Sequence, residues 1–155
     1  MRRIFVEGDN DFSFLLALGF SAREVKNSGG KSRVCTDLSK AEGNKGMVDQ
    51  DPFGNTPAYM KQFETLKEDS FRITLHDPRK DNWLLVLKPE FEAWFLNFCK
   101  RTNIGLKDYK LSEKPNEFKT QLGAKKNIYK RDQFKKLISN NIENPVLAEI
   151  KEFLS

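Results

Sequence analysis

The chain has 155 residues, 38% of them hydrophobic, and a formal net charge of +5. This length suits one domain around a single hydrophobic core. No apolar run approaches the roughly 18 residues of a membrane span. One histidine and two cysteines exclude a multi-histidine zinc site and a disulfide framework. We therefore expect no membrane partner, and the lack of a hydrophobic leader after Met1 predicts a cytoplasmic location.

An acidic turn follows the first predicted strand. Residues 4–6 are a short apolar run, residues 7–11 are polar and turn-forming, and residues 12–18 carry apolar side chains at helical spacing. Ligands bind where such a strand ends and the next helix begins. Glu7 and Asp11 are therefore candidate site residues, and Asp11 either binds a ligand there or caps the helix.

The next segment contains a glycine-rich loop. The segment 19–27 is expected to contain a short strand or irregular edge, and residues 28–32 (SGGKS) form a loop before a helix at 33–41. The loop resembles the end of a P-loop, but Val25 occupies the position of the required first glycine. A helix start is the better interpretation, with free backbone N–H groups that can still bind an anion.

A second acidic pair follows another apolar run. Residues 46–48 predict a buried strand, and Asp49 and Asp51 come directly after it. Alternate side chains of an extended chain point the same way. Both carboxylates are therefore expected to face one site at the carboxyl end of this strand.

The remaining sequence predicts an α/β fold with a central, mostly parallel sheet flanked by helices. Glu90 and Glu92 begin the helix that follows the last predicted strand; either the helix dipole alone favours them there, or one reaches the acidic site. We expect residues 1–100 to form the core and residues 101–155 a basic helical extension packed on it as one compact domain. The predicted elements are helices at 57–69, 89–100, 116–122, 131–139 and 145–154 and strands at 71–75 and 83–87.

The positive charge is concentrated in the C-terminal third. Residues 1–99 contain 14 basic and 15 acidic side chains, whereas residues 100–155 contain 13 and 7. Such a patch is either a solvated helix face or a contact for a phosphate backbone. The candidate nucleic-acid-binding residues are Lys125, Lys126, Lys130, Arg131 and Lys135.

Two segments together resemble a Toprim domain, the fold shared by type IA and type II topoisomerases, bacterial primases, ribonuclease M5 enzymes and OLD-family nucleases. They are IFVEGDND at residues 4–11 and MVDQDPFG at residues 47–54, each at the end of an apolar strand. The resemblance covers about the first half of the chain. The modules that larger members carry are not expected here, so it implies a small stand-alone Toprim-like protein.

The resemblance implies catalytic roles for Glu7, Asp49 and Asp51, and Mg²⁺ or Mn²⁺ as the cofactor. Glu7 matches a proposed general acid/base that also organises metal, and the two aspartates match the pair that holds magnesium. Carboxylates are the usual protein ligands of Mg²⁺. Asp11, Glu90 and Glu92 are further candidate metal ligands, the glutamates for a second ion.

The leading hypothesis is thus a metal-dependent phosphodiester hydrolase that acts on DNA or RNA. One alternative is a non-catalytic nucleic-acid-binding or regulatory protein, including a subunit that works with a partner ATPase. Another is a phosphotransferase that uses the acidic cluster on small phosphates.

Overall fold

The computed structural model describes residues 2–50, 54, 56–123 and 128–155, with the backbone alone for residues 128–130. Its centre is a six-stranded sheet in the order β2-β1-β3-β6-β5-β4. The first four strands in this order are parallel, and β5 and β4 extend the sheet in antiparallel pairing. The strands are β1 (Ile4–Val6), β2 (Val25–Asn27), β3 (Lys45–Asp49), β4 (Glu64–Glu68), β5 (Arg72–Asp77) and β6 (Asn82–Leu87).

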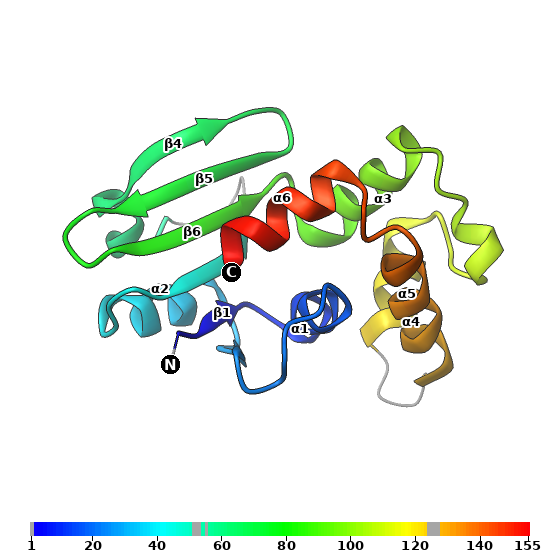
Figure 1. The fold of residues 1–155 in the computed structure, drawn as a ribbon, viewed down its shortest axis with the longest axis horizontal. Coiled ribbons are helices and arrows are strands. Elements are labelled where there is room, and N and C mark those ends of the chain that lie inside the picture. The colour runs from blue at the N-terminus through cyan, green and yellow to red at the C-terminus, as the bar shows by residue number, and fades with distance from the viewer. Residues whose placement is uncertain (1, 51–53, 55, 124–127) are drawn as a thin grey trace.

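Six α-helices surround this sheet within the described residues (Figure 1). The predicted α/β class with a mostly parallel sheet is confirmed. The short strand expected within residues 19–27 is β2, which lies at one edge of the sheet. The helices are α1 (Asp9–Ala17), α2 (Lys31–Ser39), α3 (Phe91–Arg101), α4 (Pro115–Gly123), α5 (Ile128–Asn140) and α6 (Pro145–Leu154), with 3-10 turns η1 (Ala58–Gln62) and η2 (Leu106–Tyr109).

The helix predicted at 57–69 is wrong. Residues 58–62 form only η1, and β4 then pairs with β5 as the edge strand. The apolar side chains behind the prediction pack differently: Tyr59 meets the Phe63 ring at 5.0 Å, and Leu66 is 53% exposed. Pairing with an open strand edge outweighed the apolar spacing, because β structure depends strongly on tertiary context.

Alternation along the strands builds a hydrophobic core on each face of the sheet. Met47 and Leu85 face the larger core, together with residues from α1, α3, α4, α5 and α6. Val48 and Leu84 face the smaller core, which α2 covers. Gly46 lies under α2, where an added Cβ would meet Leu38 and Leu84 at 3.0 Å each.

The C-terminal helices share the larger core with the sheet. Phe118 of α4 and Phe134 of α5 stack around Phe95 of α3, at ring distances of 5.5 and 5.1 Å. Helices α3, α4 and α5 lie at the right of Figure 1, away from β4. Helix α6 returns to the sheet, where Lys45 Nζ donates hydrogen bonds to the carbonyl oxygens of Phe153 and Ser155.

Candidate metal centre at the carboxyl ends of β1 and β3

An acidic crevice lies where the parallel strands β1 and β3 end. Its volume is about 550 Å³. Three of its carboxylates, from Glu7, Asp11 and Asp49, come from the strand ends and the first turn of α1. Glu90 and Glu92 enter from the start of α3, so five predicted site residues line one cavity.

A hydrogen bond and the strand register hold β1 and β3 together at the floor of the crevice. Glu7 follows β1, and its Oε2 accepts a hydrogen bond from the backbone N–H of Asp49, 2.5 Å away. This contact ties the carboxyl ends of the two strands to each other. Register adds to it, since Val6 lies opposite Met47 and Asp49 opposite Leu87 of β6.

Asp11 has two different carboxylate oxygens. Its Oδ2 accepts a hydrogen bond from the backbone N–H of Gly8 at 3.1 Å, so the side chain caps the start of α1. The capping interpretation is therefore confirmed. Its Oδ1 is buried and has no hydrogen-bond partner among the described residues, and the residue as a whole is only 6% exposed.

Two further side-chain oxygen atoms in the crevice also lack a hydrogen-bond donor among the described residues. Asp49 Oδ1 and Asn10 Oδ1 are buried without a hydrogen-bond partner in the described part of the chain. Asn10 instead donates its amide N–H to Glu92 Oε1 at 2.9 Å, which joins α1 to α3. Buried acceptors without a donor are costly and rare, and a bound cation would satisfy them.

Burial and mutual repulsion favour the protonated forms of the two aspartates. Burial, followed by the charges of Asp49 and Glu7, raises the pKa of Asp11 well above its usual value. Burial and then the charge of Glu7 raise the pKa of Asp49 to about 7, although the Phe91 backbone N–H acts in the opposite direction. Without a cation, the cluster is therefore an unfavourable place for negative charge.

The fit to Mg²⁺ is good in donor chemistry and incomplete in geometry. Magnesium binds oxygen, keeps several waters and commonly takes one or two carboxylates from the protein. Asp11 and Asp49 supply that share. Over the described residues, however, no three His, Cys, Asp or Glu side chains are grouped closely enough to hold a metal ion as they stand. Asp51, the predicted partner of Asp49, lies outside the described residues.

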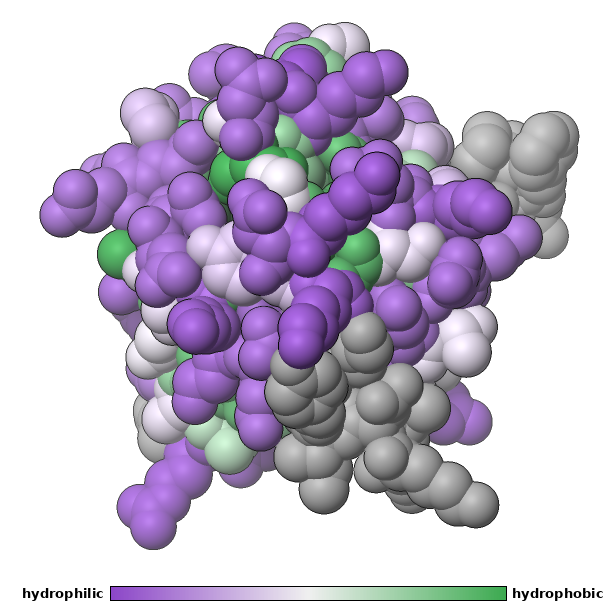
Figure 2. Space-filling model, turned by 90° about the vertical axis from the view of Figure 1, so that its right-hand side faces the viewer, coloured by the Kyte–Doolittle hydropathy of each residue, from purple (hydrophilic) through white to green (hydrophobic). Residues whose placement is uncertain are grey.

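Of the predicted nucleic-acid-binding residues, Arg131 and Lys135 have described side chains, and both belong to α5. Lys125, Lys126 and the side chain of Lys130 lie outside what the structure describes. Arg131 Nε donates to the carbonyl oxygen of Leu122 at 2.9 Å and so links α5 to α4. Lys135 is exposed. Figure 2 shows this end of the molecule, where hydrophilic side chains cover most of the surface.

The sequence patterns did not identify Asn10 or Lys119 as crevice residues. Asn10 lies within the acidic turn already singled out, but the pattern gives it no partner. Lys119 of α4 lines the crevice, and no local signal could show this, because it depends on how α4 packs against α1. Gly30, at the start of α2, also lines it, as expected if the glycine-rich loop meets a ligand.

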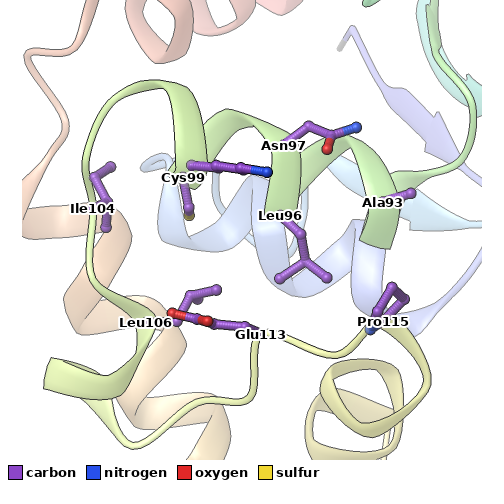
Figure 3. Close-up of a pocket in the computed structure, with 9 residues that line it drawn as sticks. Ala93, Leu96, Asn97, Cys99, Ile104, Leu106, Glu113 and Pro115 are labelled. Atoms are coloured by element: carbon purple, nitrogen blue, oxygen red, sulfur yellow. The ribbon is translucent and has the colours of Figure 1, made fainter.

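A second cavity, of about 430 Å³, lies beside α3 and lacks such chemistry (Figure 3). Leu96, Ile104, Leu106 and Pro115 make much of its lining. The Cys99 thiol also faces it, but burial raises the pKa of this thiol to about 12, so it stays protonated and unreactive. The acidic crevice is therefore the better candidate.

Comparison of the chain with models of protein families, with curated proteins and with solved structures finds no match. None of the helices in the described ranges has the length and apolarity that crossing a membrane requires.

Proposed function

We propose that the protein is a metal-dependent phosphodiester hydrolase of Toprim-like fold that acts on DNA or RNA. The observation that carries the proposal is a pair of buried carboxylate oxygens in one crevice, Asp11 Oδ1 and Asp49 Oδ1, which have no hydrogen-bond partner among the described residues. Adjacent parallel strands end at this crevice, which is where ligands bind in open α/β sheets.

The side chains have distinct roles in this proposal. Asp11 and Asp49 would hold Mg²⁺ or Mn²⁺, with Asp51 as a further ligand suggested by its spacing. The bound ion supplies a water of lowered pKa and neutralises charge on the phosphate. Glu7 fixes the Asp49 backbone and thereby the strand ends. Glu92, held by Asn10, keeps α3 against this wall.

The resemblance to Toprim domains supports the same assignment. Its two motifs are at the ends of β1 and β3, which are neighbours in the sheet. A Toprim-like fold accounts for the carboxylates at the ends of both strands, since the two strand ends share one ligand site. An intracellular setting with a nucleic-acid substrate follows from this proposal.

The test is metal-dependent cleavage by wild type and Asp49→Asn. Fluorescent single- and double-stranded DNA and RNA are incubated with Mg²⁺ or Mn²⁺. We expect cleavage by the wild type and a loss of more than about 100-fold in Asp49→Asn, because loss of a partner that only supports a metal ligand already costs about 10–100-fold.

Asp132→Asn is the matched control. It makes the same chemical change at a residue that is exposed on α5 and does not line the crevice. Equal activity of Asp49→Asn and wild type would contradict the proposal. So would cleavage that persists in a chelator.

The absence of a ready three-ligand group among the described residues favours a second candidate. In it, the protein binds nucleic acid without cleaving it, as a regulatory protein or as a subunit beside a partner ATPase. Binding of the same oligonucleotides, unchanged by chelator and by Asp49→Asn and with no cleavage, would support this candidate.

A further inference from the structure

Helix α4 forms one wall of the acidic crevice. Lys119, Thr120 and Gly123 line it, and their spacing along the helix places them on one side of α4. Phe118 and Leu122 lie on the other side and are buried in the larger core. The C-terminal helices therefore do more than cover the sheet.

Packing fixes this wall against the start of α1. The Cβ position of Gly123 is 3.9 Å from Asn10 Oδ1. Phe118 stacks on Phe95 at 5.5 Å and nearly parallel, with 4° between the ring planes. Arg131 holds the end of α4 through the Leu122 carbonyl oxygen. Lys119 is thus presented from a well-anchored backbone.

Lys119 is the one basic residue among the side chains that line the crevice in the described structure. Six carboxylate side chains line the same crevice, from Glu7, Asp9, Asp11, Asp49, Glu90 and Glu92. The ammonium group of Lys119 has no hydrogen bond or ion pair to any described residue. Thr120, in contrast, uses its hydroxyl to donate to the Asn116 carbonyl oxygen of its own helix.

The charged groups of the crevice lie at different depths. Asp11 is only 6% exposed, whereas Lys119 is exposed, as are Asp9 and Glu90. A metal ion on the carboxylates would act on the phosphate at the floor. A polymer that places one phosphate there has further phosphates on either side of it, and the exposed Lys119 ammonium group can bind one of these favourably.

From this arrangement we propose that Lys119 binds a backbone phosphate of the nucleic acid beside the one that is cleaved. This inference rests on the proposed function, because it takes the neighbouring phosphate to be the one that is cleaved. It also assigns α4 to the substrate-binding surface. The polymer would then follow a path from the carboxylate floor across α4. Lys119 acts as a substrate-positioning residue and takes no part in the bond that breaks.

The experiment compares Lys119→Ala with Lys119→Arg and with Lys114→Ala. Lys114 precedes α4, is exposed and does not line the crevice. Lys114→Ala therefore removes the same charge as Lys119→Ala but outside the crevice. We measure kcat/KM on an oligonucleotide and on bis(p-nitrophenyl) phosphate, a diester without flanking phosphates. We expect Lys119→Ala to lose about tenfold on the oligonucleotide, the usual size of one charged hydrogen bond, and nothing on the small diester.

Binding provides a readout that does not need catalysis. The affinity for a fluorescein-labelled oligonucleotide is measured by anisotropy at several salt concentrations without divalent metal. Removing one phosphate contact should reduce the slope of log K against log salt by about 0.7 on a single strand or about 0.9 on a duplex. Lys119→Arg should retain both the slope and the activity.

The outcomes separate the two proposals. If Lys119→Ala behaves like Lys114→Ala in cleavage and in salt slope, the phosphate contact is wrong while the nuclease proposal stands. Equal losses on the oligonucleotide and the small diester would also overturn it, since Lys119 would then act on the reacting phosphate. If the wild type cleaves nothing, the nuclease proposal fails, and the salt slope alone decides the role of Lys119.

Discussion

Asp11 and Asp49 are held in an environment that suits a cation better than it suits their own charges. Each has one buried oxygen without a hydrogen-bond partner in the part of the chain that the structure describes. Each also has a raised pKa, caused first by burial and then by neighbouring carboxylates. Such perturbed groups in a cleft are typical of functional sites.

The raised pKa of Asp49 predicts how stability depends on pH without metal. The usual value is 3.8 and the folded value is about 7. Between these values the folded protein binds more protons than the unfolded chain, so the free energy of unfolding falls as pH rises through this window. Asp49→Asn should remove part of that fall, on the order of 1–2 kcal/mol or a few degrees in Tm.

Thermal unfolding from pH 4 to 8 in chelator measures the effect, with Asp132→Asn as the control for a carboxylate lost from an exposed position. Mg²⁺ should then raise the Tm of the wild type at pH 8 and leave Asp49→Asn unchanged. The assignment would be refuted if the Tm of the wild type and the Tm of Asp49→Asn changed with pH to the same extent between pH 4 and 8.

The nominated crevice residues could be found from sequence because strand ends and helix starts are local features. Glu7 and Asp49 each follow an apolar run directly, and Glu92 begins a helix, so a parallel sheet brings them together. Lys119 could not be found this way. Its position depends on contacts between aromatic rings of α3, α4 and α5, which no local pattern encodes.

At the scale of elements, the parallel half of the sheet was predictable and the antiparallel edge was not. The strands β3 and β6 each contain an apolar run, residues 46–48 and 83–87, as is typical of buried parallel strands. Strand β4 is exposed along its whole length. It is defined by its hydrogen bonds to β5 and by a bulge between Thr65 and Lys67, so its own composition is uninformative.

Close packing of α2 on β3 depends on Gly46. An added Cβ at this position would lie 3.0 Å from Leu38 and from Leu84, and 3.1 Å from Val34. Gly46→Ala should therefore destabilise the protein by about 1–3 kcal/mol through overpacking. The urea midpoint should fall with an unchanged m-value.

Gly123→Ala is the control, because the nearest atom to its added Cβ is 3.9 Å away and alanine favours helix. It should not destabilise the protein. Equal midpoints for Gly46→Ala and wild type would show that α2 can move away from β3 at little cost.

At the scale of the whole molecule, residues 101–155 complete the core that begins in the sheet. Phe118, Phe134, Leu147 and Ile150 belong to the same buried cluster as Val6. The predicted boundary near residue 100 follows a change in charge. Charge is a surface property, and it does not mark where one core ends.

A chain of residues 1–101 is therefore expected not to fold alone. It would expose Phe95 and Phe98, which α4, α5 and neighbouring segments now help to bury. Circular dichroism and a urea titration of this fragment beside the full chain measure the effect. A cooperative transition in the fragment would show that the sheet and three helices are sufficient.

The sheet topology also bears on the order in which the molecule assembles. Strands β4, β5 and β6 are consecutive and antiparallel, whereas β1 and β3 must close long stretches of chain to reach their partners. Long-range pairings pay more loop entropy before they gain contacts. The meander should form early, and the crevice late. The carboxylates of the crevice then come together only after the hydrophobic core has formed. Their mutual repulsion therefore need not slow folding.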